Sequence, residues 1–231
     1  MLHRDPILRE DLQRVSNLWL IAPSARVDEA LAALPFDPPK PSLEKRSGIV
    51  TAMRIPVPDD IHWDLELTDV LKQARVERGL VRGKSKDNNL TTCERFDAKQ
   101  NRWRCSGAGS VGQGEQEIVT SARTCIEVFF GKSHDTTRIT FTDLPKSKKL
   151  RLRAGWTLAS LRRKRSAPGK VSWRVVLGGK ELDKRTFPTK DQWHLFDFDT
   201  AFAPDKHDLT IEVEASSPDK TEFCFNGWLE K

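Results

Sequence analysis

The chain has 231 residues, of which 37% are hydrophobic and 31% are charged, a balance typical of a globular protein with a sizeable core. No stretch reaches the roughly 18 consecutive apolar residues of a membrane-spanning helix, so the composition argues against an integral membrane protein. The net charge of +6 favours anionic partners or surfaces, but it does not by itself predict a nucleic-acid-binding protein.

The first 57 residues are predicted to form a small α/β segment. The apolar run Leu18–Ala22 predicts a strand, and Ile49–Ile55 predicts a second one. Between them, Ala25–Leu34 places its larger apolar residues on one face of a helix. Ser24 is suited to cap that helix, because its hydroxyl can accept a hydrogen bond from a free backbone N–H.

The proline-rich stretch at residues 56–60 is the predicted boundary, and residues 58–231 are predicted to form a second domain. A short helix is expected within Asp64–Val76. After it, six runs alternate apolar with polar residues, which places one face of each strand in a core and the other in water. These runs are Thr136–Asp143, Lys149–Trp156, Ser172–Leu177, Gln192–Phe198, Asp208–Ala215 and Glu222–Leu229. Short strands without long helices between them predict a mainly β fold, an antiparallel sandwich or barrel.

Four cysteines suggest two disulfide bonds. Cys93 and Cys105 are equidistant from a polar turn at residues 97–101, so they could face each other across a hairpin. Cys125 lies in a strand-like run just before the predicted sandwich and Cys224 in its last strand, and first and last strands are often neighbours. The alternative is that all four thiols are reduced, with Cys125 and Cys224 as small buried apolar groups. No CxxC or Cys–His spacing predicts a zinc site.

The sequence gives two opposing indications of cellular location. Met1–Arg14 is polar and lacks the apolar stretch of a signal peptide, which favours the cytoplasm. Paired cysteines favour an oxidising compartment. We expect an extracytoplasmic, periplasmic location, with the cytoplasm as the alternative.

Two motifs could indicate a cofactor, metal or catalytic site. Residues 107–112 match GxGxxG, but a polar, cysteine-bearing segment precedes them, so we expect a flexible glycine loop and not a dinucleotide site. Asp197 and Asp199 could bind Ca²⁺ or act in acid–base catalysis, but they are expected to be the polar face of a strand opposite Phe196 and Phe198. GxSxG and HExxH are absent from the sequence. We therefore predict no catalytic residues, no metal and no cofactor in this chain.

Two features suggest ligand binding. The cluster Arg162–Arg165 is either a phosphate-binding patch for nucleic acid or anionic lipid, or a solvated loop. An exposed Trp on a β-sandwich can stack against a sugar ring while Arg and His bond the hydroxyls. The predicted ligand-binding set is Trp156, Arg153, Arg162, Trp193 and His194, the alternative being that these aromatic residues are structural.

One pattern resembles a known family. The segments RWRC (102–105), RTCI (123–126), ITFTDLP, KLRLRAGW, SWRVVLGG, WHLFDFDT, DLTIEVEA and EFCFNGW follow one another in this order. They resemble the galactose-binding-like jelly-roll domain at the C-terminus of some large bacterial membrane glycosyltransferases, and LWLIAPSARVDEALAAL is similar to the α/β segment before that domain. The resemblance spans roughly residues 15–231. It implies a periplasmic module without chemistry of its own, although this chain lacks the membrane region in which the family's catalytic residues lie.

These observations lead to one preferred hypothesis and two alternatives. The preferred function is a non-catalytic, extracytoplasmic β-sandwich module that contacts a polysaccharide or a lipid-linked sugar, near a membrane surface. The first alternative is an interaction or polyanion-binding module that uses the basic loop 162–165, although nucleic acid is disfavoured because the net charge is modest. The second alternative is a hydrolase assembled on the sandwich.

Overall fold

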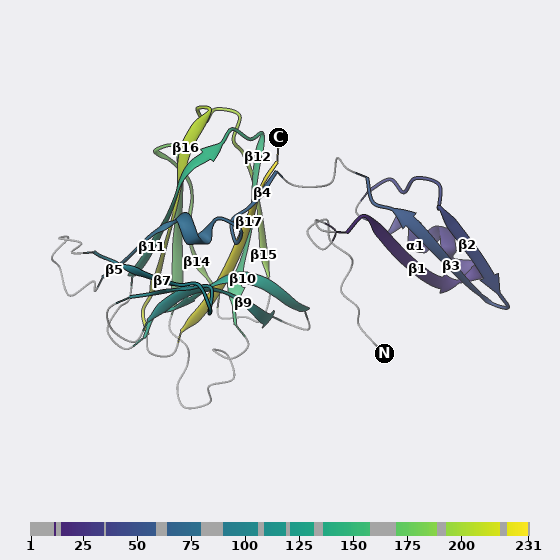
Figure 1. The fold of residues 1–231 in the computed structure, drawn as a ribbon, viewed down its shortest axis with the longest axis horizontal. Coiled ribbons are helices and arrows are strands. Elements are labelled where there is room, and N and C mark those ends of the chain that lie inside the picture. The colour runs from purple at the N-terminus through teal and green to yellow at the C-terminus, as the bar shows by residue number, and fades with distance from the viewer. Residues whose placement is uncertain are drawn as a thin grey trace. The chain divides into compact units, whose positions relative to one another are not determined.

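The computed structural model describes residues 12, 15–34, 36–58, 64–79, 90–105, 109–118, 121–131, 136–157, 170–188, 193–217 and 221–230 (Figure 1). The chain divides into two units, Met1–Asp64 and Leu65–Lys231, whereas the sequence predicts a boundary between residues 57 and 58. Within the described part of the chain, no helix is long and apolar enough to cross a membrane.

The first unit contains a three-stranded antiparallel sheet in the order β1-β3-β2. Its strands are β1 (Asn17–Pro23), β2 (Leu43–Ser47) and β3 (Val50–Pro56). The two predicted strands are confirmed as β1 and β3. Strand β2 was not predicted, because all five of its residues are exposed and its sequence, LEKRS, shows no apolar alternation.

The predicted helix is confirmed in part, as a 3-10 turn (η2, Ser24–Arg26) followed by the short helix α1 (Val27–Ala32). The capping role predicted for Ser24 is wrong, since neither element has a side-chain cap. The Ser24 hydroxyl instead forms a hydrogen bond of 2.9 Å with the hydroxyl of Thr51 in β3. This bond fixes the start of the helical segment to the sheet face that carries the buried Thr51, Met53 and Ile55.

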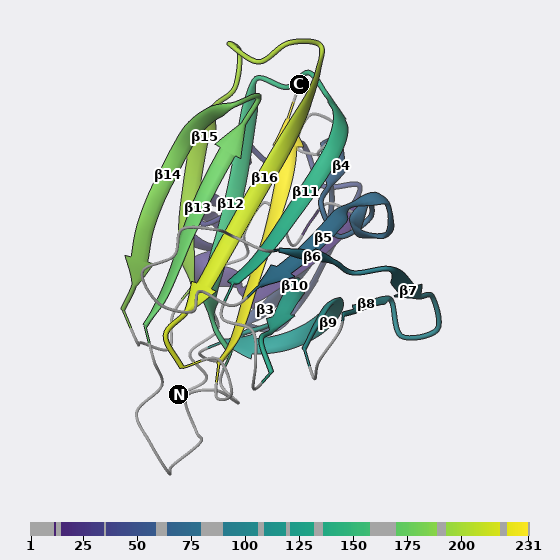
Figure 2. The same ribbon diagram turned by 90° about the vertical axis from the view of Figure 1, so that its left-hand side faces the viewer.

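The second unit is an antiparallel β-sandwich, as the sequence predicts (Figure 2). An eight-stranded sheet has the order β15-β12-β17-β10-β9-β8-β7, with β4 also paired to β17, and a six-stranded sheet has the order β14-β13-β16-β11-β5-β6. The strands of the eight-stranded sheet are β4 (Leu65–Glu66), β7 (Arg95–Asp97), β8 (Arg102–Arg104), β9 (Ser110–Ile118), β10 (Ser121–Phe129), β12 (Lys149–Trp156), β15 (His194–Asp199) and β17 (Glu222–Glu230). Those of the six-stranded sheet are β5 (Arg75–Gly79), β6 (Thr91–Thr92), β11 (Thr136–Pro145), β13 (Val171–Leu177), β14 (Lys180–Phe187) and β16 (Lys206–Ala215).

The core between the two sheets is built from the apolar half of each alternating strand. In β13, for example, Val171, Trp173, Val175 and Leu177 point inward and are at most 1% exposed. The Trp173 ring lies 5.0 Å from the ring of Phe187 and 4.8 Å from that of Phe196. Because the inward residues alternate with polar ones in β13 and β16, the six-stranded sheet presents a polar outer face. In the eight-stranded sheet, β17 is buried along almost its whole length, and Cys125 and Cys224 form a separate buried cluster with Trp193.

Three local predictions need correction. The sandwich begins before residue 136, since β5, β9 and β10 belong to it, so Cys125 lies inside the sandwich. The expected helix within Asp64–Val76 is only a 3-10 turn, η4 (Leu71–Gln73). The glycine motif is not a loop throughout: Ser110–Gly112 form the start of β9, and Gly109 packs against the guanidinium group of Arg78. Gly107 and Ala108 lie outside the described residues.

Both predicted disulfide bonds are present and no cysteine is free. Cys93–Cys105 joins the residues that flank the β7–β8 hairpin, with their Cα atoms 4.5 Å apart. Cys125–Cys224 joins the paired strands β10 and β17, with a Cα separation of 5.9 Å. Two disulfides are typical of a protein that folds in an oxidising, extracytoplasmic compartment.

Candidate functional site

The outer face of the six-stranded sheet carries a row of polar side chains at regular positions. Period-two alternation turns Ser172 and Arg174 of β13 outward, opposite the buried Trp173 and Val175. The same alternation turns Glu212 and Glu214 of β16 outward. Because β13 lies between β14 and β16, these residues come together at the centre of the sheet's outer face.

The strand registers align these side chains into two rows that run across the sheet. In the first row, Ser172 pairs with Thr186 of β14 and with Glu214 of β16, which in turn pairs with Thr136 of β11. In the second row, two residues further along the strands, Lys184, Arg174, Glu212 and Arg138 occupy the corresponding positions. The first row therefore presents three hydroxyls and one carboxylate, and the second presents three cations and one carboxylate.

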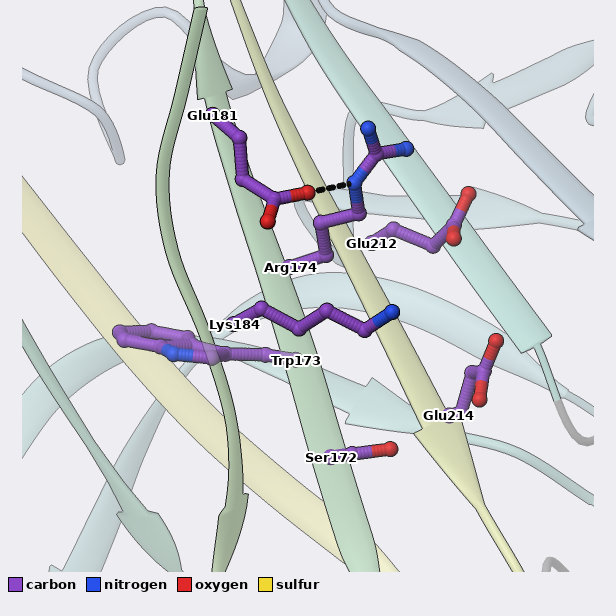
Figure 3. A pocket seen from close by; sticks show the side chains of 7 residues that line it. All are labelled: Ser172, Trp173, Arg174, Glu181, Lys184, Glu212 and Glu214. Carbon is purple, nitrogen blue, oxygen red and sulfur yellow. Dashed lines mark hydrogen bonds and ion pairs between the residues drawn. The ribbon is translucent and has the colours of Figure 1, made fainter.

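A groove lies over these rows. One hollow, of about 270 Å³, is lined by side chains from β13, β14 and β16: Ser172, Trp173, Arg174, Glu181, Lys184, Glu212 and Glu214 (Figure 3). A second hollow, of about 300 Å³, is lined by Thr136, Lys170, Ser172, Thr186, Glu214, Ala215 and Ser216. Ser172 and Glu214 line both, so the two hollows adjoin, and we refer to them together as the β13 groove.

Ion pairs hold the charged side chains at one end of the groove. The Arg174 Nε donates to Glu181 Oε2 over 2.5 Å, and this hydrogen bond raises the pKa of Arg174. Arg138 donates to Glu212 Oε2 from two nitrogens, over 2.9 and 2.7 Å. These pairs limit the rotamers of long side chains, so part of the entropy cost of ordering them on ligand binding is already met.

The groove is suited to hydrogen bonding more than to ring stacking. Trp173 borders it but is only 1% exposed, and its indole N–H donates to Asp183 Oδ2 over 2.7 Å. Figure 3 shows the Trp173 ring pointing away from the side chains of Arg174, Lys184 and Glu212. The accessible groups are thus hydroxyls, carboxylates and cations, which together can donate and accept hydrogen bonds.

The structure brings some of the predicted ligand-binding residues together on the other sheet. Arg153 of β12 lies between two indoles, with its guanidinium carbon 4.9 Å from the Trp193 ring centroid and 4.8 Å from that of Trp228. It is 5% exposed and donates to the carbonyl of Thr124 over 3.1 Å. Trp193 also packs against the Cys125–Cys224 disulfide. These contacts are internal to the fold, and a role of Arg153 or Trp193 in ligand binding stays a prediction.

The other members of the predicted set lie apart from this cluster. Trp156 is fully buried in the main core, so its ring cannot serve as an exposed sugar platform. The spacing explains this: residues 153 and 156 are an odd number apart in one strand and therefore point to opposite faces. Next to Trp193, His194 is half-buried; burial lowers its pKa and the charge of Arg185 lowers it further. Arg162 and the basic loop 162–165 lie outside the described residues.

The paired aspartates have structural roles, in agreement with the expectation of a polar strand face. Asp197 forms an ion pair with Arg151, with 2.9 Å between the two groups. Asp199 accepts a hydrogen bond from the backbone N–H of Ala201 over 2.9 Å. Phe196 and Phe198 stack on the opposite side of the strand with their centroids 6.4 Å apart. Within the described part of the chain, no group of three or more His, Cys, Asp or Glu residues is placed to hold a metal ion.

The residues of the β13 groove were not predicted to form a site. Their period-two pattern was visible, but it indicates only that they share a polar face. The rows depend on the order β14-β13-β16-β11, in which β11 and β16 pair although about 70 residues separate them along the chain. No local signal in the sequence specifies that order.

Comparison with known proteins gives only a distant likeness. No protein-family model and no curated protein matches the sequence. Among solved structures, the CBM51-2 and INT domains of ZmpB from Clostridium perfringens, in complex with GlcNAc, have a TM-score of 0.40 and 12% identity, and cover 82% of this chain. This chain covers 40% of that structure, so it spans less than half of its length.

Two further structures show the same weak similarity. A CBM51 from Clostridium perfringens GH95 in complex with methyl-galactose has a TM-score of 0.34 and 12% identity, covering 52% of this chain and 79% of its own. A family 35 carbohydrate-binding module from Clostridium thermocellum has a TM-score of 0.31 and 8% identity, covering 52% of this chain and 87% of its own. Support for a function of this chain therefore has to come from its own residues.

Proposed function

We propose that this chain is a non-catalytic recognition module that binds a carbohydrate in the β13 groove. The observation that supports the proposal most directly is the row of Thr186, Ser172, Glu214 and Thr136 on the floor of a groove formed by two adjoining hollows. Sugar hydroxyls donate and accept hydrogen bonds at the same atom, so they are matched by a surface that alternates hydroxyls with carboxylates and cations.

The charge balance of the groove favours a hydroxyl-rich ligand over a polyanion. Its lining includes three carboxylates, of Glu181, Glu212 and Glu214, which face the cations of Arg174, Lys184 and Lys170. A polyanion-binding site needs an excess of cations. With the charges nearly balanced, a phosphate-rich ligand would meet as much repulsion as attraction. The alternative function through the basic loop 162–165 stays a prediction, since that loop lies outside the described residues.

The proposed setting is the periplasm, beside an enzyme that acts on sugars. The two disulfides support an extracytoplasmic location. The relation to a membrane glycosyltransferase, and with it a lipid-linked sugar as the ligand, rests on the sequence resemblance alone. In that setting the chain would hold a saccharide while another protein or domain performs the chemistry.

The test is a glycan array that includes galactosides and N-acetylglucosaminides, followed by calorimetric titration of each glycan that binds. The double substitution Ser172→Ala with Glu214→Ala removes hydrogen-bonding groups from the shared floor of the groove. We expect it to weaken binding about thirtyfold, the effect of losing two hydrogen bonds worth about 1 kcal/mol each.

The matched control is Glu115→Gln, which neutralises an exposed carboxylate of β9 on the other sheet and should leave the affinity unchanged. A heparin column at low salt tests the polyanion alternative in parallel. The proposal fails if the array shows no binding, or if the double variant binds each glycan as tightly as the unmodified chain does.

A further inference from the structure

The first unit carries most of the exposed apolar side chains. The described part of the chain has seven large hydrophobic residues that are markedly exposed, and five of them lie in this small unit: Trp19, Ile21, Leu43, Ile49 and Val50. Single exposed apolar residues are common, but a cluster of them marks a surface that contacts a protein or a membrane.

The cluster forms one face of the three-stranded sheet. Trp19 pairs with Arg54 of β3, which pairs with Leu43 of β2. Pro23 pairs with Val50, and Ile21 lies between Trp19 and Pro23 on the same side of β1. Trp19 is 56% exposed and Ile21 is 69% exposed. We call this surface the Trp19 face.

The opposite face of the same sheet is covered. Thr51, Met53 and Ile55 alternate with the residues of the Trp19 face along β3 and are at most 2% exposed. The hydrogen bond between the hydroxyls of Ser24 and Thr51 fixes the helical segment on that side. The sheet therefore has one face that is covered within the unit and one that is not.

The hairpin between β2 and β3 extends the Trp19 face. Its two-residue turn is Gly48-Ile49, in which Gly48 has the positive φ of 59° that a tight hairpin requires. Ile49 is 83% exposed. Turn positions usually hold Gly, Asn, Asp or Ser, so an isoleucine at the tip of a hairpin is costly in water unless another surface covers it.

The Trp19 face differs in charge from the rest of this unit, where Glu29 pairs with Arg26 and Glu44 pairs with Arg46. The Trp19 face includes two exposed cations, Lys45 and Arg54, and none of its described residues is acidic. The carboxylates lie elsewhere: Asp28 and Glu29 belong to α1, and Glu44 points to the other side of β2 because it alternates with Leu43 and Lys45.

We propose that the Trp19 face docks on the surface of a lipid bilayer that contains anionic headgroups. Tryptophan and aliphatic side chains enter the boundary between headgroups and acyl chains, while lysine and arginine attract anionic lipid. The Trp19 face combines both features with a protruding apolar hairpin and no opposing carboxylate. This inference concerns the first unit and does not depend on carbohydrate binding by the second.

The test is sedimentation of the full chain with vesicles of pure phosphatidylcholine and with vesicles that contain about one-third phosphatidylglycerol. We expect binding to the anionic vesicles that weakens as salt is added. Ile49→Ser should weaken this binding about tenfold, since it removes a side chain that is buried on docking. Lys45→Gln should weaken it about fivefold, since it removes one charge worth about 1 kcal/mol near the lipid surface.

The control is Leu195→Ser in β15, which removes a side chain that is 60% exposed in the other unit and should leave vesicle binding unchanged. Circular dichroism of each variant checks that the fold is intact. The proposal is overturned if the chain does not sediment with anionic vesicles, or if Leu195→Ser reduces binding as much as Ile49→Ser does. It is also overturned if Ile49→Ser abolishes self-association in analytical ultracentrifugation without affecting vesicle binding, because the face would then join two copies of the chain.

Discussion

Asp183 of β14 connects the wall of the β13 groove to the core. It accepts hydrogen bonds from the indole of Trp173 over 2.7 Å and from Arg185 over 2.6 and 2.7 Å. Burial alone would raise the pKa of Asp183, but the hydrogen bonds from Arg185 and Trp173 outweigh it and hold that pKa below its ordinary value of 3.8. The folded state therefore stabilises the ionised form of Asp183 relative to the unfolded state.

We expect Asp183→Ala to lower the free energy of unfolding at neutral pH by about 1–3 kcal/mol, because a buried indole N–H loses its acceptor. Because folding lowers the pKa of Asp183, the stability that its ionised carboxylate contributes is present above pH 3.8. It is lost as the pH falls through the pKa of Asp183 in the folded state. Denaturant unfolding at several pH values measures both effects. Asp205→Ala, at an aspartate that is 90% exposed, serves as the control and should change stability by less than about 0.5 kcal/mol. Equal effects of the two substitutions would contradict this role of Asp183.

Trp193 protects one of the two disulfides from reductant. Cys125 and Cys224 are both 0% exposed and pack against Trp193, whereas Cys105 is half-buried. We expect a limiting amount of reductant to open Cys93–Cys105 first in the folded chain, and Trp193→Ala to speed reduction of Cys125–Cys224 roughly tenfold by exposing it. Thiol labelling with peptide mapping measures the order, and Trp19→Ala in the first unit is the matched control. If Cys125–Cys224 opened first in the unmodified chain, this protective role would be wrong.

At the scale of single strands, two glycines in strand interiors differ in whether the surrounding atoms leave room for a side chain. A Cβ atom on Gly227 of β17 would lie 2.4 Å from Leu152 Cδ2, 2.7 Å from Leu67 Cδ1 and 3.1 Å from the carbonyl oxygen of Arg151. On Gly114 of β9 the nearest atom, from Glu127, would be 3.4 Å away, an ordinary contact. We expect Gly227→Ala to destabilise the chain by about 2 kcal/mol through overpacking. Gly114→Ala should be neutral, or stabilising by up to about 1 kcal/mol. Thermal unfolding of both variants tests the pair, and a loss of stability in Gly114→Ala as large as in Gly227→Ala would refute the packing argument.

The strands that the sequence predicts are those whose apolar residues alternate with polar ones and face the core. Lys149–Trp156 and Asp208–Ala215 alternate clearly, because each is an interior strand with the core on one side. The edge strand β14 was missed, since its sequence KELDKRTF contains only two large apolar residues and most of its side chains are exposed. This strand supplies Glu181, Lys184 and Thr186, so one side of the groove lies on an element that hydrophobic periodicity does not reveal.

At the scale of the whole molecule, the two disulfides constrain the chain to different extents. Cys93–Cys105 has a sequence separation of 12, and Cys125–Cys224 a separation of 99. Loop entropy predicts a loss of about 3 kcal/mol when the first pair is replaced by alanines and of about 4–5 kcal/mol when the second is replaced. Denaturant unfolding of the two double variants provides the comparison, and a larger loss for the Cys93–Cys105 pair would contradict the entropic explanation.

The pairing of Cys93 with Cys105 could be predicted because their symmetry about a turn is visible along the chain. The pairing of Cys125 with Cys224 was predicted correctly but from a wrong premise, because β10 is not the first strand of the sandwich. The groove could not be predicted in this way. Ser172 and Glu214 are 42 residues apart, and only the pairing of β13 with β16 makes them neighbours. The predicted ligand-binding set of Trp156, Arg153, Arg162, Trp193 and His194 was chosen by residue type. Residue type does not reveal burial: Trp156 is fully buried, and the guanidinium group of Arg153 is enclosed by two indoles.

The most direct test of carbohydrate recognition by the β13 groove is to map a bound glycan by nuclear magnetic resonance. The full chain, labelled with ¹⁵N, would be titrated with the glycan that binds most tightly on the array. We expect the largest amide shift changes at the outward residues of β13, β14 and β16, among them Ser172, Arg174 and Glu214. Shift changes confined to the eight-stranded sheet around Trp193 and His194, or no changes at saturating glycan, would contradict the assignment of the groove.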